Sequence, residues 1–300
     1  MMSKKYAIFH IDGGIGKHIA ATAVAKCIKN NHPDRELLVV CAWPEPFLNL
    51  DFVDRVYRTG STPYFYQDYI LGKDSLLFKH EPYFTTDHVH AKLPLIENWC
   101  KLYGLDYNNE GPELVFNLRQ KQLAHTLWQS DKPIMVMQSS GGMFAQAEAQ
   151  PYKWARDMPI SIMMKIVEEF SPYYNIFQVT RPDAVIPQGV TPVNQQMSIM
   201  ELVTILLRSQ KRVFIDSMMQ HAAAALQLPS TVMWIGTSPK IFGYELHDNI
   251  VANQKENFNL PDSYLFSYNF DGITHECPYK DDSEMFDVND IIESVRRQGI

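Results

Sequence analysis

The sequence predicts an α/β protein with two doubly wound parallel-sheet domains, and three features of the 300-residue chain support this prediction. Short apolar runs alternate with amphipathic helices through most of the chain, as in parallel sheets covered by helices. The alternation restarts after a polar, proline-containing turn, Asp131-Lys132-Pro133. In each half, one apolar run ends in small or polar residues that open a helix. We therefore expect one domain over residues 1–130, a second over residues 131–280, and a C-terminal helix in residues 281–300.

Composition places the chain among globular proteins, because 46% of its residues are hydrophobic and 20% are charged. A formal net charge of −7 gives no support to extensive binding of nucleic acid or anionic membrane. No window reaches the roughly 18 apolar residues of a transmembrane segment, and no secretory signal is visible. The 4 cysteines are widely spaced, which fits free thiols in a reducing compartment. We therefore expect a cytoplasmic protein.

The first half opens with a β-turn-α-β unit. An apolar strand over residues 6–11 breaks at Asp12-Gly13-Gly14-Ile15-Gly16, and a helix with apolar positions at helical spacing follows from Lys17. The continuous apolar run 37–41 predicts a second strand that is buried on both faces and parallel to the first. Farther on, we expect a strand over 52–57, helices over 93–103 and 121–129, and a strand-like segment over 111–120. Residues 44–90 are rich in Tyr and Phe, which fits either an acceptor-binding surface or ordinary loop anchors.

The glycine turn admits three interpretations. A dinucleotide-binding fingerprint would need Gly or Ala where Ile19 stands, and an acidic residue at the end of the second strand. A P-loop would need Gly in place of Ile11 and Ser or Thr in place of His18. The remaining interpretation is a backbone that passes close to a ligand at a helix start. A tight turn without any ligand is the alternative.

The second half repeats the strand–helix alternation. A strand over 134–137 ends in Ser139-Ser140-Gly141-Gly142. The later strands are expected over 174–179, 213–215 and 231–235, and the helices over 160–170, 198–209, 220–226 and 288–295. The strand over 213–215 stops at Asp216-Ser217, and a helix with His221 in its first turn follows. Ligands bind at the carboxyl ends of strands in such sheets, and a helix N-terminus favours anionic groups. We interpret this junction as half of a nucleotide-sugar site, with the glycine turn as the other half.

These motifs resemble those of glycosyltransferase family 9, the ADP-heptose:lipopolysaccharide heptosyltransferases. Gly13-Gly14-Ile15-Gly16 is similar to the opening glycine turn of that family. Gly141-Gly142 and Lys153-Trp154 resemble its glycine-containing loop and its Lys-x-Trp-Pro segment, and Glu201-Leu202 resembles the Glu-Leu of its next helix. The segment 216–224 is similar to its Asp-Ser-Gly-x-x-His-x-Ala-Ala pattern. The resemblance implies a GT-B architecture, in which two Rossmann-like domains face a cleft that holds donor and acceptor.

Two residues depart from the family pattern. Met218 replaces a glycine, and Lys17 stands where the family's presumed catalytic aspartate follows the glycine turn. A lysine replaces a carboxylate as a base only if burial lowers its pKa strongly. Asp12, across the glycine turn, could reach the same cleft, or could be a simple turn residue.

The resemblance implies transfer of a sugar from a nucleoside-diphosphate-sugar such as ADP-heptose to a hydroxyl group, with inversion. The sequence has no D-x-D metal motif, so we expect neither metal nor cofactor. The acceptor could be a glycan, a lipid-linked sugar or a modified nucleobase. In our hypothesis Asp12 is the base, Lys17 or Lys153 stabilises the diphosphate, and Glu201 accepts from the ribose hydroxyls. The catalytic candidates are Asp12 and Lys17, and the donor-binding candidates are Gly13, Gly14, Gly16, Lys153, Glu201, Asp216, Ser217, Gln220 and His221. The competing hypothesis is a catalytically inactive protein that binds sugar nucleotides or carbohydrates.

Overall fold

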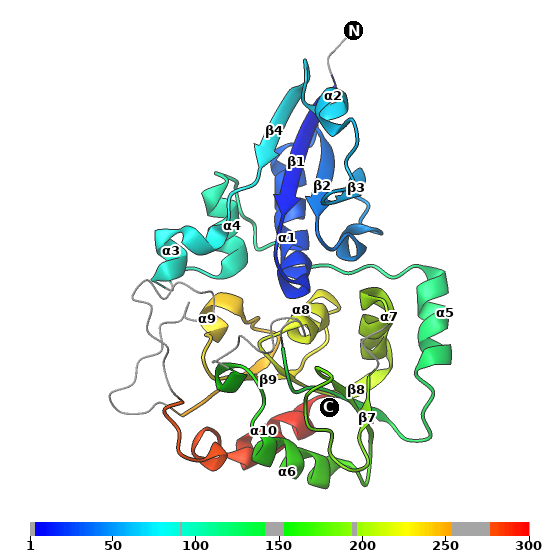
Figure 1. Cartoon of the computed structure of the whole chain (residues 1–300), viewed down its shortest axis with the longest axis vertical. Helices are drawn as coiled ribbons and strands as arrows, with labels where there is room; N and C mark the ends of the chain where they lie inside the picture. Colours follow the sequence, from blue (N-terminus) through cyan, green and yellow to red (C-terminus); the bar gives the residue numbers. More distant parts are fainter. Residues whose placement is uncertain (1–3, 91, 142–152, 194–196, 254–276, 300) are drawn as a thin grey trace.

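The computed structural model describes residues 4–90, 92–141, 153–193, 197–253 and 277–299. Two parallel sheets lie one above the other in the molecule (Figure 1). The first sheet has the strand order β3-β2-β1-β4, and all its neighbours are parallel. Its strands are β1 (Lys5–Ile11), β2 (Glu36–Cys41), β3 (Arg55–Arg58) and β4 (Asp74–Phe78). The predicted parallel pairing of the first two strands is confirmed, whereas β4 was not expected in the aromatic-rich region.

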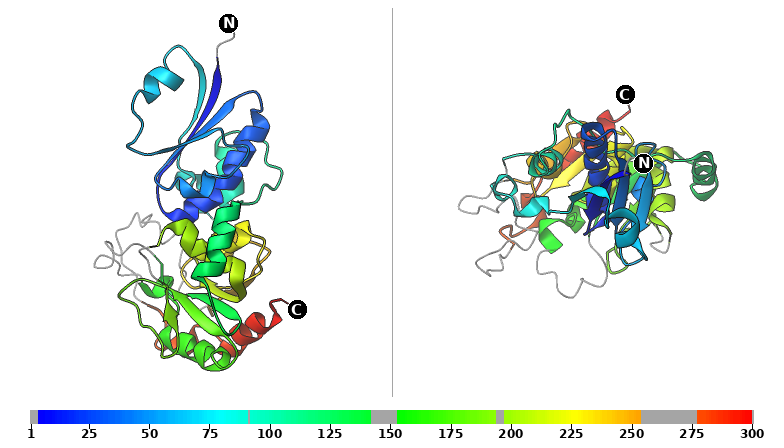
Figure 2. Two further views of the ribbon diagram at one scale, coloured as in Figure 1. Left: turned by 90° about the vertical axis from the view of Figure 1, so that its right-hand side faces the viewer. Right: turned by 90° about the horizontal axis from the view of Figure 1, so that it is seen from above.

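Side chains alternate strictly between the two faces of the first sheet. Phe9 and its neighbours in register pack beneath α1 (Ile15–Asn31) and α4 (Leu95–Leu102). The opposite face presents Tyr6 and Ile8 to the short helix α2 (Phe65–Tyr69), which lies on the other side of the sheet (Figure 2). The smaller elements of this half are η1 (Glu45–Phe47), η2 (Pro82–Phe84) and α3 (Thr86–Val89). Because both faces of the sheet are covered, successive residues of a strand are buried, and the apolar runs in the sequence are continuous.

The second sheet has six parallel strands in the order β10-β9-β8-β5-β6-β7. They are β5 (Ile134–Gln138), β6 (Asn175–Val179), β7 (Thr191–Pro192), β8 (Ser209–Ile215), β9 (Thr231–Trp234) and β10 (Asp248–Val251). On one face lie α6 (Ile160–Phe170) and α10 (Val288–Arg297), and on the other lie α7 (Ile199–Val203), α8 (Met218–Ala225) and α9 (Pro239–Phe242). The predicted fold class, two Rossmann-like parallel-sheet halves, is confirmed.

The connection between the halves differs from the prediction. Residues 111–117 form no strand, and the expected strand over 111–120 is wrong. Leu114 and Phe116 alternate as in a strand because both are buried in the core, but no strand pairs with them. Helix α5 (Leu118–Leu127) starts earlier than expected because Asn117 and Gln120 form a reciprocal capping box. It packs against α7 and the 3₁₀ turn η5 (Thr204–Arg208). The single helix predicted over 198–209 is thus divided into α7 and η5.

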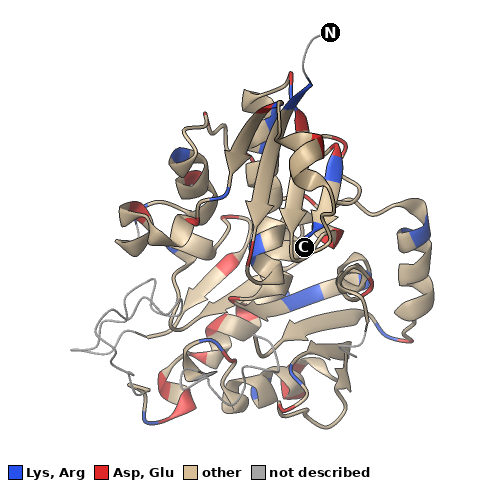
Figure 3. Cartoon of the chain, turned by 45° about the horizontal axis from the view of Figure 1, so that its top comes forward, with Lys and Arg blue, Asp and Glu red and all other residues tan. Residues whose placement is uncertain are grey.

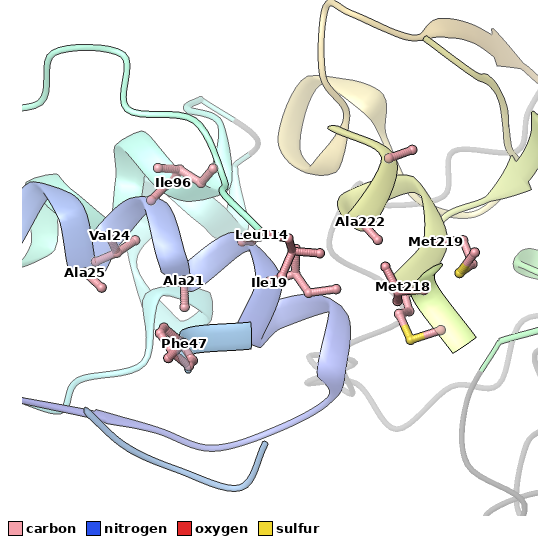
Figure 4. Packing of buried hydrophobic residues seen from close by; sticks show 14 of the residues in the cluster. Ile19, Ala21, Val24, Ala25, Phe47, Ile96, Leu114, Met218, Met219 and Ala222 are labelled. Atoms are coloured by element: carbon pink, nitrogen blue, oxygen red, sulfur yellow. The ribbon is translucent and has the colours of Figure 1, made fainter. Parts of the chain in front are cut away.

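The two halves share one hydrophobic core. Ile19 of α1 and Leu114 face Met218 and Ala222 of α8 across the junction (Figure 4). Basic and acidic residues are scattered over both halves (Figure 3). Within the described ranges, no helix is both long and apolar enough to span a bilayer.

Candidate functional site

Each sheet contains a switch point, at which successive strands stop being added on one side of the first strand and continue on its other side. In the first sheet β1 lies between β2 and β4, with α1 on one face and α2 on the other. In the second sheet β5 lies between β6 and β8, with α6 and α8 on opposite faces. In the second sheet the chain after β5 and the chain after β8 run to opposite faces, and ligands of open α/β folds bind at the carboxyl ends of strands at such a point. In the first sheet the chain after β4 returns to the face of α1, where α4 packs. Both predicted motifs directly follow a strand at a switch point.

The structure brings the two predicted motifs into direct contact. Gly16 in the first turn of α1 lies against His221 of α8, so that a Cβ at Gly16 would be 2.9 Å from His221 Cδ2 and 3.5 Å from Met218 Cα. Glycine is therefore needed at position 16 by packing between the halves. Gly13 has a different requirement, because its φ of +102° lies in the left-handed region that favours glycine. Gly14 is the N-cap of α1, and a Cβ there would meet nothing within 4 Å.

Lys17 is held in an ion pair that sequence reasoning missed. Its Nζ lies 2.5 Å from both carboxylate oxygens of Glu81, the residue before η2. The ammonium also lies 5.1 Å from the ring centre of Tyr83 and 5.2 Å from that of Trp99. Burial lowers the pKa of Lys17, and the hydrogen bond that its ammonium donates to Glu81 opposes that effect. A buried lysine needs a counter-charge, but Glu81 is 64 residues away and nothing local identified it.

Asp12 occupies a more open position at the end of β1. Its side chain is 62% exposed, and its carboxylate lies 3.6 Å from His10 Nδ1. The neighbouring His18 points inward instead, with its Nδ1 2.8 Å from the carbonyl oxygen of Gly14 and a pKa lowered to about 4 by burial. Asp12 therefore lies beside the glycine turn, as expected, but without a partner group that fixes its orientation among the contacts of the described residues.

On the donor side, Gln138 at the end of β5 joins two of the expected elements. Its Nε2 donates to Ser217 Oγ at 3.0 Å, and its Oε1 accepts from the backbone N–H of Met219 at 3.0 Å. Gly141 follows in the same crevice, where a Cβ would be 3.2 Å from Ser217 Oγ. Gln138 therefore caps α8 from the neighbouring strand, a role that its position in an apolar strand did not reveal.

Arg156 is a second residue near the ends of β5 and β8 that sequence reasoning missed. Its Nε donates to the carbonyl oxygen of Asp216 at 3.0 Å, and its Nη2 donates to the same atom. The preceding residue, Ala155, accepts from the backbone N–H of Gly236 at 2.7 Å. The loops that follow β5, β8 and β9 therefore meet at one point, and a partly buried guanidinium lies there.

A buried charge cluster supports the loop after β5. Arg181, which is 5% exposed, donates to Asp157 Oδ2 at 2.6 Å and to the carbonyl oxygen of Gly141. Asp157 in turn accepts from the backbone N–H of Gly141 at 3.3 Å. These contacts fix Gly141 from both sides and hold its backbone against Ser217.

His221 lies in the seam between the halves. Its ring Nδ1 is 2.8 Å from the hydroxyl oxygen of Tyr244, and the ring is only 6% exposed. Burial lowers the pKa of His221 to about 4, so the ring is neutral at neutral pH and carries no charge toward a phosphate. The adjacent Gln220 is fully buried and donates to the carbonyl oxygen of Phe242 at 3.1 Å.

Glu201 and Lys153 are two further donor-binding candidates. Glu201 Oε2 accepts from the backbone N–H of Ser198 at 2.9 Å in a capping box, which lowers the pKa of Glu201. The backbone of Lys153 opens the 3₁₀ turn η4 (Lys153–Ala155), but its side chain, like all of Gly142, lies outside the described residues.

Comparison with known proteins finds similarity in structure only. No protein-family model matches the sequence, and no curated protein matches it. A glycosyl transferase family 9 protein from Veillonella parvula is 11% identical with a TM-score of 0.66, over 98% of this chain and 96% of that one. The E. coli ADP-heptose lps heptosyltransferase II is 13% identical with a TM-score of 0.64, over 84% and 91%. The iron-containing dodecameric glycosyltransferase TibC from enterotoxigenic E. coli is 15% identical with a TM-score of 0.67, over 98% and 76%.

These likenesses show that the chain has the two-domain fold of family 9 glycosyltransferases. The resemblance that the motifs indicated is therefore found again in three dimensions. The iron belongs to the description of TibC; among the described residues of this chain, no three His, Cys, Asp or Glu side chains are grouped to hold a metal ion.

Proposed function

We propose that this protein is a glycosyltransferase that moves a sugar from a nucleoside-diphosphate-sugar, of the ADP-heptose type, to a hydroxyl acceptor. The observation that carries the proposal is the contact between the two switch-point motifs, in which Gly16 lies against His221 at the junction of the halves. The carboxyl edges of the two parallel sheets, where ligands bind in open α/β folds, are thereby brought to one seam. The structural neighbours support the proposal, since TibC was also solved with ADP-D-β-D-heptose.

The donor diphosphate is placed at the switch point between β5 and β8. The N-terminus of α8 lies there, and a helix N-terminus favours negative charge. Arg156 adds a planar guanidinium that matches phosphate oxygens, and Lys153 remains a proposed second cation. Asp216 and Ser217 lie at the strand-to-helix turn and remain proposed donor-binding residues, and Glu201 is retained as the proposed partner of the ribose hydroxyls.

The reaction is a direct displacement at the anomeric carbon. The acceptor oxygen attacks the face opposite the diphosphate, the bond to the diphosphate oxygen breaks, and the configuration inverts. The electron pair leaves with the nucleoside diphosphate, whose charge the positive groups of the donor side stabilise. The proton of the acceptor hydroxyl passes to a base on the first half, where the carboxylates of Asp12 and Glu81 lie near the glycine turn. The acceptor is a glycan, a lipid-linked sugar or a modified nucleobase.

A binding protein without turnover is the second candidate, and Lys17 favours it. This lysine stands where the resembled family has its presumed catalytic aspartate, and here it is neutralised by Glu81. Such a protein would bind the same donors through the same crevice but would release no nucleoside diphosphate.

A donor screen followed by turnover measurements separates the two. ADP-sugars and other nucleoside-diphosphate-sugars are tested by thermal shift, since a ligand at 100 times its Kd stabilises the folded state by about 2.7 kcal/mol. The stabilising donors are then incubated with glycan, lipid-linked and nucleobase acceptors, and products are identified by mass spectrometry. Release of nucleoside diphosphate that requires an acceptor supports the transferase. Binding without release supports the binding protein, and no binding by any donor contradicts both.

A further inference from the structure

Glu81 lies at the switch point of the first sheet. Glu81 lies three residues after the end of β4 (Asp74–Phe78), and the glycine turn follows the neighbouring strand β1. The pair Lys17–Glu81 therefore joins the segments that follow β1 and β4 at the carboxyl edge of the sheet. A Cβ at Gly13 would lie 3.8 Å from Lys17 Nζ, so the pair is directly beside the glycine turn.

The two members of the pair are buried to different extents. The side chain of Lys17 is 6% exposed, whereas that of Glu81 is 32% exposed. The ammonium thus lies behind the carboxylate, enclosed by the rings of Tyr83 and Trp99. Both carboxylate oxygens lie 2.5 Å from the same nitrogen, which fixes the position of the carboxylate, while the side chain as a whole is partly exposed. Lone pairs not directed at Lys17 remain to accept a proton.

The seam with the donor half is close to this pair. Lys17 is the next residue after Gly16, which touches His221, so one turn of α1 carries both the interdomain contact and the partner of Glu81. Glu81 belongs to the first half, whereas Ser217 and Arg156 belong to the second. Displacement with inversion needs the base and the leaving group on opposite sides of the reacting carbon.

We propose that Glu81 is the general base of this transferase and that Lys17 is its positioning residue. The inference rests on the proposed function. Glu81 takes the proton from the acceptor hydroxyl as the acceptor oxygen bonds to the anomeric carbon, and the bond to the diphosphate breaks with its electrons on the nucleoside diphosphate. Asp12 is the alternative carboxylate, but it is 62% exposed and has only the 3.6 Å approach to His10 among the ion pairs of the described residues. A base contributes most when its geometry is fixed in advance.

The test compares Glu81→Gln and Lys17→Met with a matched ion pair on the same helix. Lys26 of α1 pairs with Glu113, which is also remote in sequence; their side chains are 39% and 36% exposed, so the carboxylates of the two pairs are similarly exposed and only the lysines differ. Each variant is assayed for kcat, for KM of donor and acceptor, and for nucleoside-diphosphate affinity by calorimetry, with circular dichroism as the check on folding. Glu81→Gln should lower kcat by about 100-fold or more, the usual contribution of a general base, with nucleoside-diphosphate affinity within about twofold of wild type. Lys26→Met and Glu113→Gln should keep wild-type kcat.

Because Lys17 is proposed to act through Glu81, we also expect the effects of the two substitutions on kcat to be coupled. Lys17→Met should lower kcat, and the double variant Lys17→Met/Glu81→Gln should be no slower than Glu81→Gln alone, because the two residues form one unit. Glu81→Asp keeps the charge and should give an intermediate kcat, which also tests the inference if Glu81→Gln fails to fold.

Three results would overturn the inference. An active wild type whose kcat is unchanged by Glu81→Gln and by Glu81→Asp would remove Glu81 as the base and leave the transferase proposal intact. A large loss of kcat in Asp12→Asn with a normal Glu81→Gln would assign the base to Asp12. A wild-type protein that binds donors but transfers no sugar would overturn the proposed function, and the role of Glu81 with it.

Discussion

Replacement of Gly16 by valine tests the contact between the halves. A Cβ at this position would lie 2.9 Å from Cδ2 of His221, whereas carbon atoms in ordinary contact are about 3.5–4.0 Å apart. The two helix ends would therefore have to separate by about 0.6–1.1 Å. The histidine ring cannot easily yield, because it is 6% exposed and hydrogen-bonded to Tyr244.

The magnitude follows from two opposing effects. Overpacking a well-packed interior costs about 1–3 kcal/mol, and valine brings two further methyl groups beyond the Cβ. Removing glycine from a helix returns less than about 1 kcal/mol. We therefore expect Gly16→Val to lower the free energy of unfolding by about 2 kcal/mol and to weaken binding of ADP.

Urea denaturation followed by circular dichroism measures the stability, and calorimetry measures the ADP affinity. Gly111→Val is the matched control, because a Cβ at Gly111 meets nothing within 4 Å, and its stability should stay within about 0.5 kcal/mol of wild type. If Gly16→Val unfolds at the same urea concentration as wild type and binds ADP equally well, the halves do not pack through this glycine.

Three further predictions concern the donor side and the buried histidines. Gln138→Leu removes the acceptor of the buried N–H of Met219 and should cost about 1–3 kcal/mol in the urea unfolding free energy; unchanged stability would show that this N–H has another acceptor. Arg156→Ala should weaken ADP affinity roughly 10-fold or more, as loss of a charge-assisted hydrogen bond does, whereas the exposed Arg119→Ala on α5 should not; equal affinities for the two variants would remove Arg156 from the diphosphate site. Four histidines are buried with pKa lowered to about 4 from 6.5, and their neutral forms are favoured by the fold. Below pH 6.5 these histidines bind protons in the unfolded chain but remain neutral in the folded chain. The free energy of unfolding should therefore fall between pH 6.5 and 4 by up to about 1.4 kcal/mol per pH unit for each histidine. A constant free energy of unfolding across this window in urea titrations would contradict their burial. These histidines are His18, His88, His221 and His247.

The sequence was most informative where local periodicity and burial coincide. The unit β1-α1-β2 and the helix α6 were predicted because their apolar spacing is set by neighbours within one or two turns. Residues 111–120 show the limit of this reasoning. Leu114 and Phe116 alternate because both enter the core from an irregular segment, and the sequence pattern is the same as that of a strand.

The missed site residues share a physical cause, which is that their partners are remote in sequence. Gln138 meets Ser217 across 79 residues, and Lys17 meets Glu81 across 64. These distances become short only through the strand order, with β4 beside β1 and β8 beside β5. Local pattern indicates which strands exist, but it does not fix their order, so it cannot identify a side chain that acts across a switch point.

The three glycines of the turn have different structural roles, although the sequence suggested a single shared role. All three glycines were expected to let a ligand approach the backbone. Gly16 is instead required by the approach of His221, and Gly13 by a φ of +102°. Gly14 alone of the three has open space where a Cβ would stand, and it lies at the exposed N-terminus of α1. The part of the turn that remains for a ligand is therefore Gly14, at the edge of the crevice that Glu81 borders from β4. A helix N-terminus there and a fixed carboxylate beside it suit a polar acceptor better than a second phosphate, because the carboxylate would repel that charge. These features favour our proposal that the acceptor binds to the first half and the diphosphate to the second.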